Sequence, residues 1–89
     1  MKSFRQLERW VRGFSNHRRI EMLTLLEKQP ELSVIEIAEK LNIKFATASA
    51  HLTRLATAGL VLKRNDDKSV RHKISERGQS ILKFLRTLE

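Results

Sequence analysis

The sequence of 89 residues has no cysteine, no tyrosine, one proline and three glycines. Without cysteine there can be no disulfide framework, no cysteine-ligated zinc finger, no iron–sulfur cluster and no thiol nucleophile. No unbroken apolar run exceeds three residues, whereas a helix that crosses a bilayer needs about 18. The glycines form no phosphate-binding loop, and neither a pair of acids placed for acid–base work nor a nucleophile beside a base is evident. We therefore expect no enzyme and no cofactor.

Acidic residues are outnumbered, with 18 Lys and Arg against 10 Asp and Glu and a net charge of +8. Residues 1–20 hold six cations and one acid, and residues 44–75 hold seven cations and two acids, so each block carries +5. Between them, residues 21–43 hold two cations and five acids, for −3. Charge that only keeps a protein soluble is usually mixed in sign, whereas a basic block is typical of a surface that meets phosphates. This distribution indicates a nucleic-acid partner, and a solvated basic surface without a partner is the alternative.

Length and apolar content indicate a single domain over residues 1–89. Hydrophobic residues make up 40% of the chain, too many for a disordered basic tail, and a chain of this size buries roughly 60–68% of its unfolded surface. The first 15 residues contain four cations (Lys2, Arg5, Arg9 and Arg12) in place of an apolar leader block. We expect a cytoplasmic, nucleoid-associated protein with no membrane partner.

Four segments before residue 60 have the spacing of amphipathic helices. Their expected bounds are 4 to about 13 behind Ser3, 17 to about 28 behind Ser15 or Asn16, 34–41 behind a Ser33–Glu36 capping box, and 45–58 before Gly59. Only residues 42–44 separate the third helix from the fourth, and Asn42 tolerates the left-handed conformation that such a turn needs. A helix, a short turn and a second helix are thus predicted, with Ala48, Leu52 and Leu55 facing inward.

The remainder of the chain predicts a hairpin and a last helix. Residues 60–64 and 69–74 are β-prone and are joined by four turn-forming residues. Ser75 then caps a helix with an apolar stripe, which consists of Ile81, Leu85 and Leu88 and is flanked by Leu82 and Phe84. The predicted fold is mainly α with a small β-hairpin, in the order α-α-α-α-β-β-α, which is a winged helix-turn-helix.

The outward side of the predicted fourth helix carries no carboxylate. In a helix-turn-helix the second helix enters the major groove, and a wing lies along the flanking phosphates. The residues expected to contact DNA are Lys44, Ala46, Thr47, Ala50, Thr53, Arg54, Arg64, Arg71 and Lys73. Alanine can touch only a thymine methyl, so hydrogen-bonded readout rests on Thr47, Thr53 and Arg54. Arg54 can also simply lie along the surface, and Phe45 can be a core residue at the start of the helix.

Several segments resemble the ArsR-type transcriptional repressors. The similarity lies in Asn16–Ile20, Glu31–Leu41, Thr47–Leu52 with its Ser-x-His-Leu pattern, and Ala58–Val61, and Ile74–Gly78 is similar to the strand-to-helix junction of MarR-type winged helices. The resemblance implies a homodimer, paired through its terminal helices, that binds an inverted-repeat operator and represses transcription. The interface residues would be Phe4, Leu7, Trp10, Phe14, Ile81, Phe84, Leu85 and Leu88. Packing within one chain is an equally open explanation for the apolar surface of the first helix.

The departures from the ArsR pattern argue against metal sensing. Ser33 and Ile35 stand where thiol-based sensors of that family carry cysteines, and the last helix offers Glu76 and Glu89 but no histidine. Lys44 stands where the family commonly has a capping serine. We expect no metal site, and the sequence leaves open whether a small-molecule effector binds.

The function predicted is that of a sequence-specific, dimeric repressor that binds double-stranded DNA. One alternative is a nonspecific, architectural winged helix that binds DNA or RNA, because the outward face of the fourth helix is rich in alanine. Another is a protein-interaction module, which the basic blocks disfavour. The cations of the first helix either flank the dimer face and reach DNA or face solvent.

Overall fold

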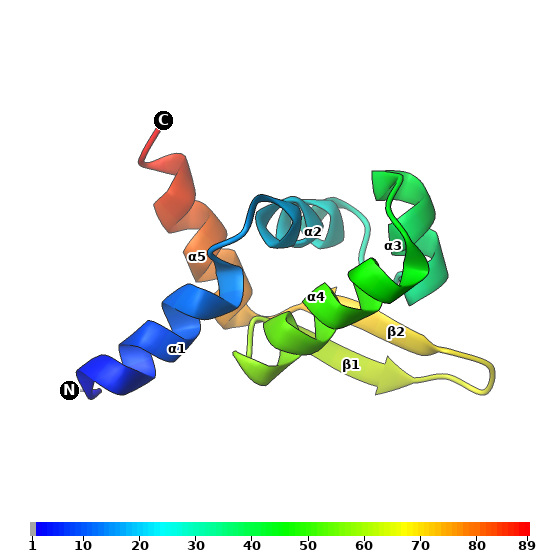
Figure 1. Ribbon diagram of the computed structural model, residues 1–89, viewed down its shortest axis with the longest axis horizontal. Helices are drawn as coiled ribbons and strands as arrows, with labels where there is room; N and C mark the ends of the chain where they lie inside the picture. Colours follow the sequence, from blue (N-terminus) through cyan, green and yellow to red (C-terminus); the bar gives the residue numbers. More distant parts are fainter. Residues whose placement is uncertain (1) are drawn as a thin grey trace.

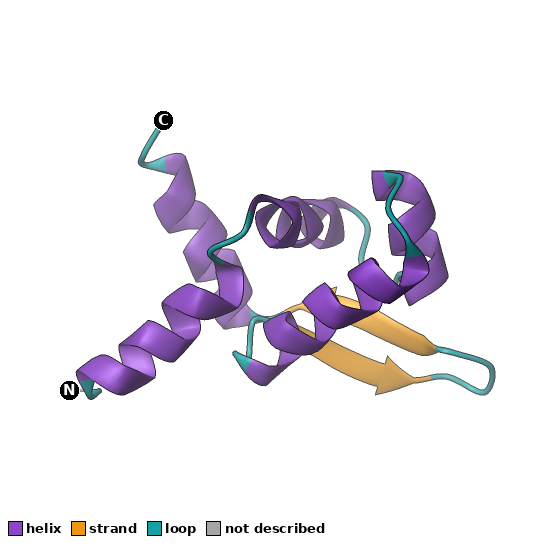
Figure 2. Ribbon diagram, viewed as in Figure 1, coloured by secondary structure: helices purple, strands orange, loops and turns teal. Residues whose placement is uncertain are grey.

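The computed structural model describes residues 2–89 and has five helices and one antiparallel hairpin in the predicted order (Figures 1 and 2). The elements are α1 Phe4–Phe14, α2 His17–Lys28, α3 Val34–Leu41, α4 Phe45–Thr57, β1 Val61–Asn65, β2 Val70–Ile74 and α5 Glu76–Arg86. Each helix and strand lies within about two residues of its expected position. Figure 1 shows α1 and α5 projecting from one end of the molecule, with both termini there, and the hairpin tip at the other end.

Side-chain caps fix where four of the helices begin. Ser3 and Ser33 each form a reciprocal capping box with the residue three positions on, Ser75 accepts from the amide of Gly78, and Asn16 accepts from two amides of α2. Lys44, before α4, makes no side-chain cap. The first-turn amides of α4 are therefore free of a capping side chain, as the absence of serine at this position predicts.

The turn between α3 and α4 depends on Asn42, which has φ 55° and ψ 51°. Asparagine adopts this left-handed conformation more readily than most residues that carry a Cβ. The amide of Ile43 donates to the carbonyl of Ala38 at 3.0 Å and closes the end of α3. The turn therefore fixes α4 against α3, the helix pair predicted from the sequence.

The hairpin pairs Val61 with Ile74 and Arg64 with Arg71. On its other edge, β2 also pairs with a single residue before α3, because Leu32 forms an antiparallel bridge with His72. No sequence pattern predicts this bridge. The amide of His72 donates to the Leu32 carbonyl at 2.9 Å. This bridge ties the wing to the chain just before α3.

The core lies between α2, α3, α4 and the base of the hairpin. Its largest fully buried side chains are Met22, Leu23, Leu26, Ile37, Leu52, Leu55, Leu60, Val61 and His72. Phe14 is also buried within the chain, so we leave its ring out of the dimer surface proposed below. Gly13 lies so close to Ala58 that an added Cβ would overlap the alanine side chain, which shows how tightly the end of α1 packs on α4.

Trp10 also packs within the chain. The guanidinium of Arg77, on α5, lies 4.0 Å from the centre of the indole ring, a cation–π contact that joins α1 to α5. Nη1 of Arg77 also donates to the carbonyl of Ala58 at 3.3 Å. The tryptophan is half-buried, so at least part of its ring packs within the chain.

Candidate nucleic-acid interface

The two faces of α4 separate as the sequence predicts. Ala48, Leu52 and Leu55 are buried against the core. The side chains on the opposite face are all exposed, namely Ala46, Thr47, Ala50, Thr53, Arg54 and Thr57. The structure thus presents one helix face without a carboxylate, held at a fixed angle by the turn and by α3.

Two of the threonines on this face already use their hydroxyl protons. Thr53 donates to the carbonyl of Ser49 at 3.0 Å, and Thr57 donates to the carbonyl of Thr53 at 2.9 Å. A hydroxyl bonded in this way can still accept a hydrogen bond, but it is no longer a free donor. Thr47 and Arg54 are the predicted readout residues whose donors remain free.

Phe45 is exposed, so a core position for its ring is excluded. Its side chain borders an apolar groove of about 290 Å³ together with Ile35 of α3 and Val70 of β2. The groove places an exposed aromatic ring beside the start of α4, on a surface that also includes the wing.

The wing arginines are paired with carboxylates. Nε and Nη2 of Arg64 donate to Oε2 of Glu31 at 3.2 and 3.1 Å. Nη1 of Arg71 donates to Oε1 of Glu36 at 2.9 Å, and its Nε lies 3.5 Å from Asp66. Because these two arginines face each other across the strands, their repulsion is offset by the surrounding acids.

The acid beside Arg71 is itself held in its charged form. Hydrogen bonds from the backbone and side chain of Ser33 lower the pKa of Glu36, and the charge of Arg71 lowers it further. Arg71 also donates to the carbonyl of Glu31 at 3.3 Å. Arg71 thus has three protein acceptors and braces the wing against α3. Of the three wing cations predicted to contact phosphate, Lys73 is the one without a carboxylate partner in residues 2–89.

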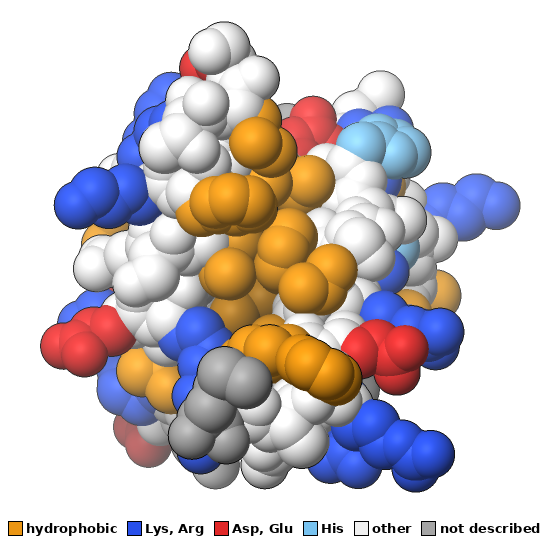
Figure 3. Space-filling view, turned by 90° about the vertical axis from the view of Figure 1, so that its left-hand side faces the viewer, with side chains coloured by type: hydrophobic (Ala, Val, Ile, Leu, Met, Phe, Trp, Pro, Cys, Tyr) orange, Lys and Arg blue, Asp and Glu red, His pale blue; other side chains and the backbone are white. Residues whose placement is uncertain are grey.

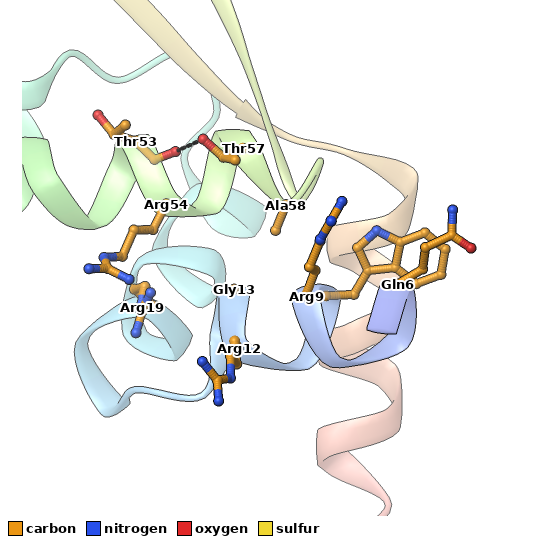
Figure 4. Close-up of a pocket in the computed structure, with 10 residues that line it drawn as sticks. Gln6, Arg9, Arg12, Gly13, Arg19, Thr53, Arg54, Thr57 and Ala58 are labelled. Atoms are coloured by element: carbon orange, nitrogen blue, oxygen red, sulfur yellow. Dashed lines mark hydrogen bonds between the residues drawn. The ribbon is translucent and has the colours of Figure 1, made fainter. Parts of the chain in front are cut away.

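Positive charge gathers instead beside the second half of α4, next to Thr53, Arg54 and Thr57 of the exposed face. A cavity of about 390 Å³ is lined by the arginines at positions 9, 12, 19 and 54, from α1, α2 and α4 (Figure 4). The sequence pointed to Arg54, Arg9 and Arg12 separately, but it did not indicate that they share a cavity or that Arg19 joins them. A signal was available for Arg19, because it precedes Met22, Leu23 and Leu26 at the spacing of the buried face of α2.

His51 lies next to this group of arginines. Burial lowers its pKa, and the positive charges of Arg19 and Arg54 lower it further. The imidazole is therefore neutral at neutral pH, and its proton affinity reports the charge of the surroundings.

A second surface, made by the terminal helices, is apolar. Phe4, Leu7, Val11, Phe84 and Leu88 are exposed, and Ile81 and Leu85 are half-buried. Figure 3 shows an apolar stripe running over this end of the molecule with charged side chains on both sides. We refer to these seven residues as the terminal-helix stripe.

The described residues, 2–89, contain no group of three or more His, Asp or Glu that is arranged to hold a metal ion. The same part of the chain has no helix that is both long and apolar enough to cross a membrane.

Solved structures of regulators resemble the chain over almost its whole length. One is the homodimeric winged helix-turn-helix DNA-binding domain of Mb0332 from Mycobacterium bovis, described as a possible ArsR-family transcriptional regulator, at 28% identity and a TM-score of 0.84 over 99% of this chain and 87% of that chain. The transcriptional regulator HlyU from Vibrio vulnificus is 32% identical, with a TM-score of 0.75 over 92% and 85% of the two chains. NolR from Sinorhizobium fredii is 25% identical, with a TM-score of 0.85 over 94% and 84%.

None of the curated protein sequences matches the chain. The sequence profile of the MarR family, however, matches residues 16–73, which run from the cap of α2 to the second wing strand. The matched region includes the helix-turn-helix and most of the wing. The chain therefore belongs to the MarR family, and its fold is that of the winged helix-turn-helix transcriptional regulators.

Proposed function

We propose that this regulator is a homodimer that binds double-stranded DNA with α4 in the major groove and represses transcription. The observation that carries the proposal is the exposed face of α4, which lacks carboxylates and is fixed by α3. A helix of 13 residues is about 20 Å long, and the major groove, about 12 Å wide, admits it.

Contacts at the two ends of α4 would have different roles. At its start, Lys44 and the uncapped first-turn amides suit a phosphate, because helix N-termini attract anions. Further along, Thr47 would meet base edges and Arg54 would contact a base edge or a flanking phosphate, while Ala46 and Ala50 permit close approach and can contact thymine methyls.

The wing would contribute less charge to DNA than its sequence suggests. Arg64 and Arg71 are engaged by acids, so we assign them to positioning the wing and leave them out of the proposed DNA contacts. Lys73 is free to neutralise a phosphate. Specificity would then depend on α4 and on DNA shape, with the wing setting orientation.

Dimerisation would proceed through the terminal-helix stripe. Residues such as Phe4, 80% exposed, and Leu88 form a contiguous apolar surface of a kind that soluble monomers rarely leave uncovered. Pairing through this end leaves the wings at the far ends of the dimer (Figure 1). The homodimeric state of the Mb0332 domain supports this arrangement.

The DNA-binding face is tested by placing a carboxylate on it. Ala50→Glu should weaken binding to a mixed-sequence duplex by about 100-fold or more, because an acid would face phosphates and base edges at close range. Gln79→Glu, on the exposed side of α5, adds the same charge elsewhere and is the matched control. Fluorescence anisotropy of a labelled duplex gives both affinities. Equal, small losses for the two variants would show that α4 does not enter the groove.

An architectural, nonspecific role is the second candidate. It is favoured by the alanines of the outward face and by the two threonine hydroxyls that already donate within α4. The two functions differ in whether affinity depends on DNA sequence.

A further inference from the structure

The cavity beside α4 lies at the junction of three helices. Its walls come from α1, from the first turn of α2 and from the second half of α4, and its volume is about 390 Å³. Figure 4 shows the side chains of Arg19 and Arg54 next to each other, with Arg9 and Arg12 contributed by α1. Polar groups from Gln6 and Thr57 also line it.

Arg19 is the most unusual group in this cavity. Only 9% of its surface is exposed, and its Nε and Nη1 atoms are buried without a hydrogen-bond partner in the described residues. Burial lowers its pKa and so does the nearby charge of Arg54, yet an arginine keeps its proton at any physiological pH. An unpaired buried guanidinium destabilises the fold, and within residues 2–89 Arg19 has no negatively charged partner.

No Asp or Glu lines the cavity. The acid that comes nearest along the sequence is Glu8, which sits 3.9 Å from Nη2 of Arg12 on the exposed side of α1. Apart from this long, exposed ion pair of Arg12, the four arginines have no acid partner in residues 2–89. A solvated basic surface would not require one of them to be buried and unsatisfied.

The cavity is separate from the terminal-helix stripe. Gln6, Arg9 and Gly13 repeat at the spacing of one helix face, and Arg9 is turned by roughly 160° from Val11 of the stripe. A partner subunit docked on the stripe would therefore leave the cavity open on the α4 side.

We infer that this cavity is a binding site for a phosphate group, held by Arg19 and Arg54 with Arg9 and Arg12 at its rim. Guanidinium groups bind phosphate oxygens in a bidentate manner, and one dianionic group in the cavity would offset the unpaired charge of Arg19 and relieve its repulsion with Arg54. The phosphate can come from the DNA backbone that flanks α4 or from a free phosphate-bearing ion. The DNA source rests on the proposed function, whereas the site itself does not.

The first arm of the test uses the protein alone. Inorganic phosphate is titrated against chloride at constant ionic strength, and binding is followed by the unfolding temperature and by the NMR titration of His51. Phosphate should raise the unfolding temperature and also the pKa of His51, since it would neutralise the two arginines that lower it. Arg19→Met should weaken phosphate binding by about tenfold or more, whereas Arg5→Met, an equal charge loss outside the cavity, should not.

The second arm measures duplex binding over a salt series with the same proteins. If the DNA backbone supplies the phosphate, Arg19→Met lowers the slope of log K against log salt by about 0.9. If a free ion supplies it, the slope is unchanged while phosphate still binds the wild-type protein. If the Arg19→Met variant folds poorly, the phosphate titration and the salt series are repeated with Arg9→Met, which removes a cation from the exposed rim of the cavity.

The site is refuted if inorganic phosphate does not bind the wild-type protein, or if it binds the Arg19→Met and Arg9→Met variants as tightly as it binds the wild-type protein. This result is distinct from failure of the proposed function, in which the wild-type protein would bind phosphate but no duplex.

Discussion

Replacing Phe84 by alanine should weaken the proposed dimer. In one chain 54% of the Phe84 surface is exposed, and fully burying a phenylalanine contributes up to about 3 kcal/mol. Burial of the exposed part against a partner would then contribute about 1.5 kcal/mol, and twofold symmetry doubles it to about 3 kcal/mol per dimer. The dissociation constant of the dimer should rise about 100-fold.

Phe45→Ala is the matched control for this experiment. The same side chain is removed from a position with nearly the same exposure, 56%, but outside the terminal-helix stripe. Sedimentation equilibrium over a dilution series gives the dimer constants of all three proteins, and circular dichroism verifies that they fold. A wild-type chain that is monomeric at micromolar concentration, or a Phe45→Ala variant that shifts the dissociation constant as much as Phe84→Ala does, would contradict dimerisation through the terminal-helix stripe.

Three further predictions concern stability and the wing. Burial lowers the pKa of His72, so the folded state resists protonation of this residue. The free energy of unfolding should therefore fall as the pH drops below about 6.5, by at most about 1.4 kcal/mol per pH unit. Urea unfolding at several pH values should show a smaller pH dependence in His72→Asn, and the pH dependence that remains is due to His51. Arg71→Ala should lower stability by about 1 kcal/mol with little change in the salt slope of DNA binding, whereas Lys73→Ala should lower that slope by about 0.9 and leave stability unchanged; the opposite pattern would exchange their roles. Asn42→Ala should cost about 1 kcal/mol in urea unfolding because of its left-handed backbone, and Asn42→Gly should cost less.

Local signals account for most of the fold. The Ser33 capping box, the turn at Asn42 and the stop at Gly59 each depend on one or two residues and on backbone chemistry that acts within a single turn. Such signals do not depend on the rest of the chain, which is why the helix-turn-helix could be predicted. The bridge between Leu32 and His72 involves one residue on one side and has no periodicity to detect.

The site was harder to predict because its charges are arranged by tertiary contacts. Glu31 and Glu36 belong to the acidic segment of the chain but lie against Arg64 and Arg71, more than thirty residues away in sequence. Net charge along the chain cannot show this pairing, so the wing looked more basic than it is. Residues 1–20, the first basic block, show the opposite case. Arg19, on the buried face of α2, lies in the same cavity as Arg54, so cations that are far apart in the sequence come together in the fold.

Helical spacing also could not separate the core from an interface. Phe14 shares the apolar side of α1 with Phe4, yet the former is buried in the chain and the latter is exposed. The difference arises because the end of α1 packs on α4 and its start extends away from the domain (Figure 1). Sequence periodicity reports which side of a helix is apolar and does not say what covers it.

The central claim is that the chain is a sequence-specific dimer that reads DNA with α4. Selection of bound sequences from a pool of random duplexes tests it most directly. We expect a twofold-symmetric motif whose half-sites are about 34 Å apart, one turn of DNA, or a multiple of that. A pool that stays random after selection would contradict sequence-specific recognition, and a motif with a single half-site would contradict the dimer.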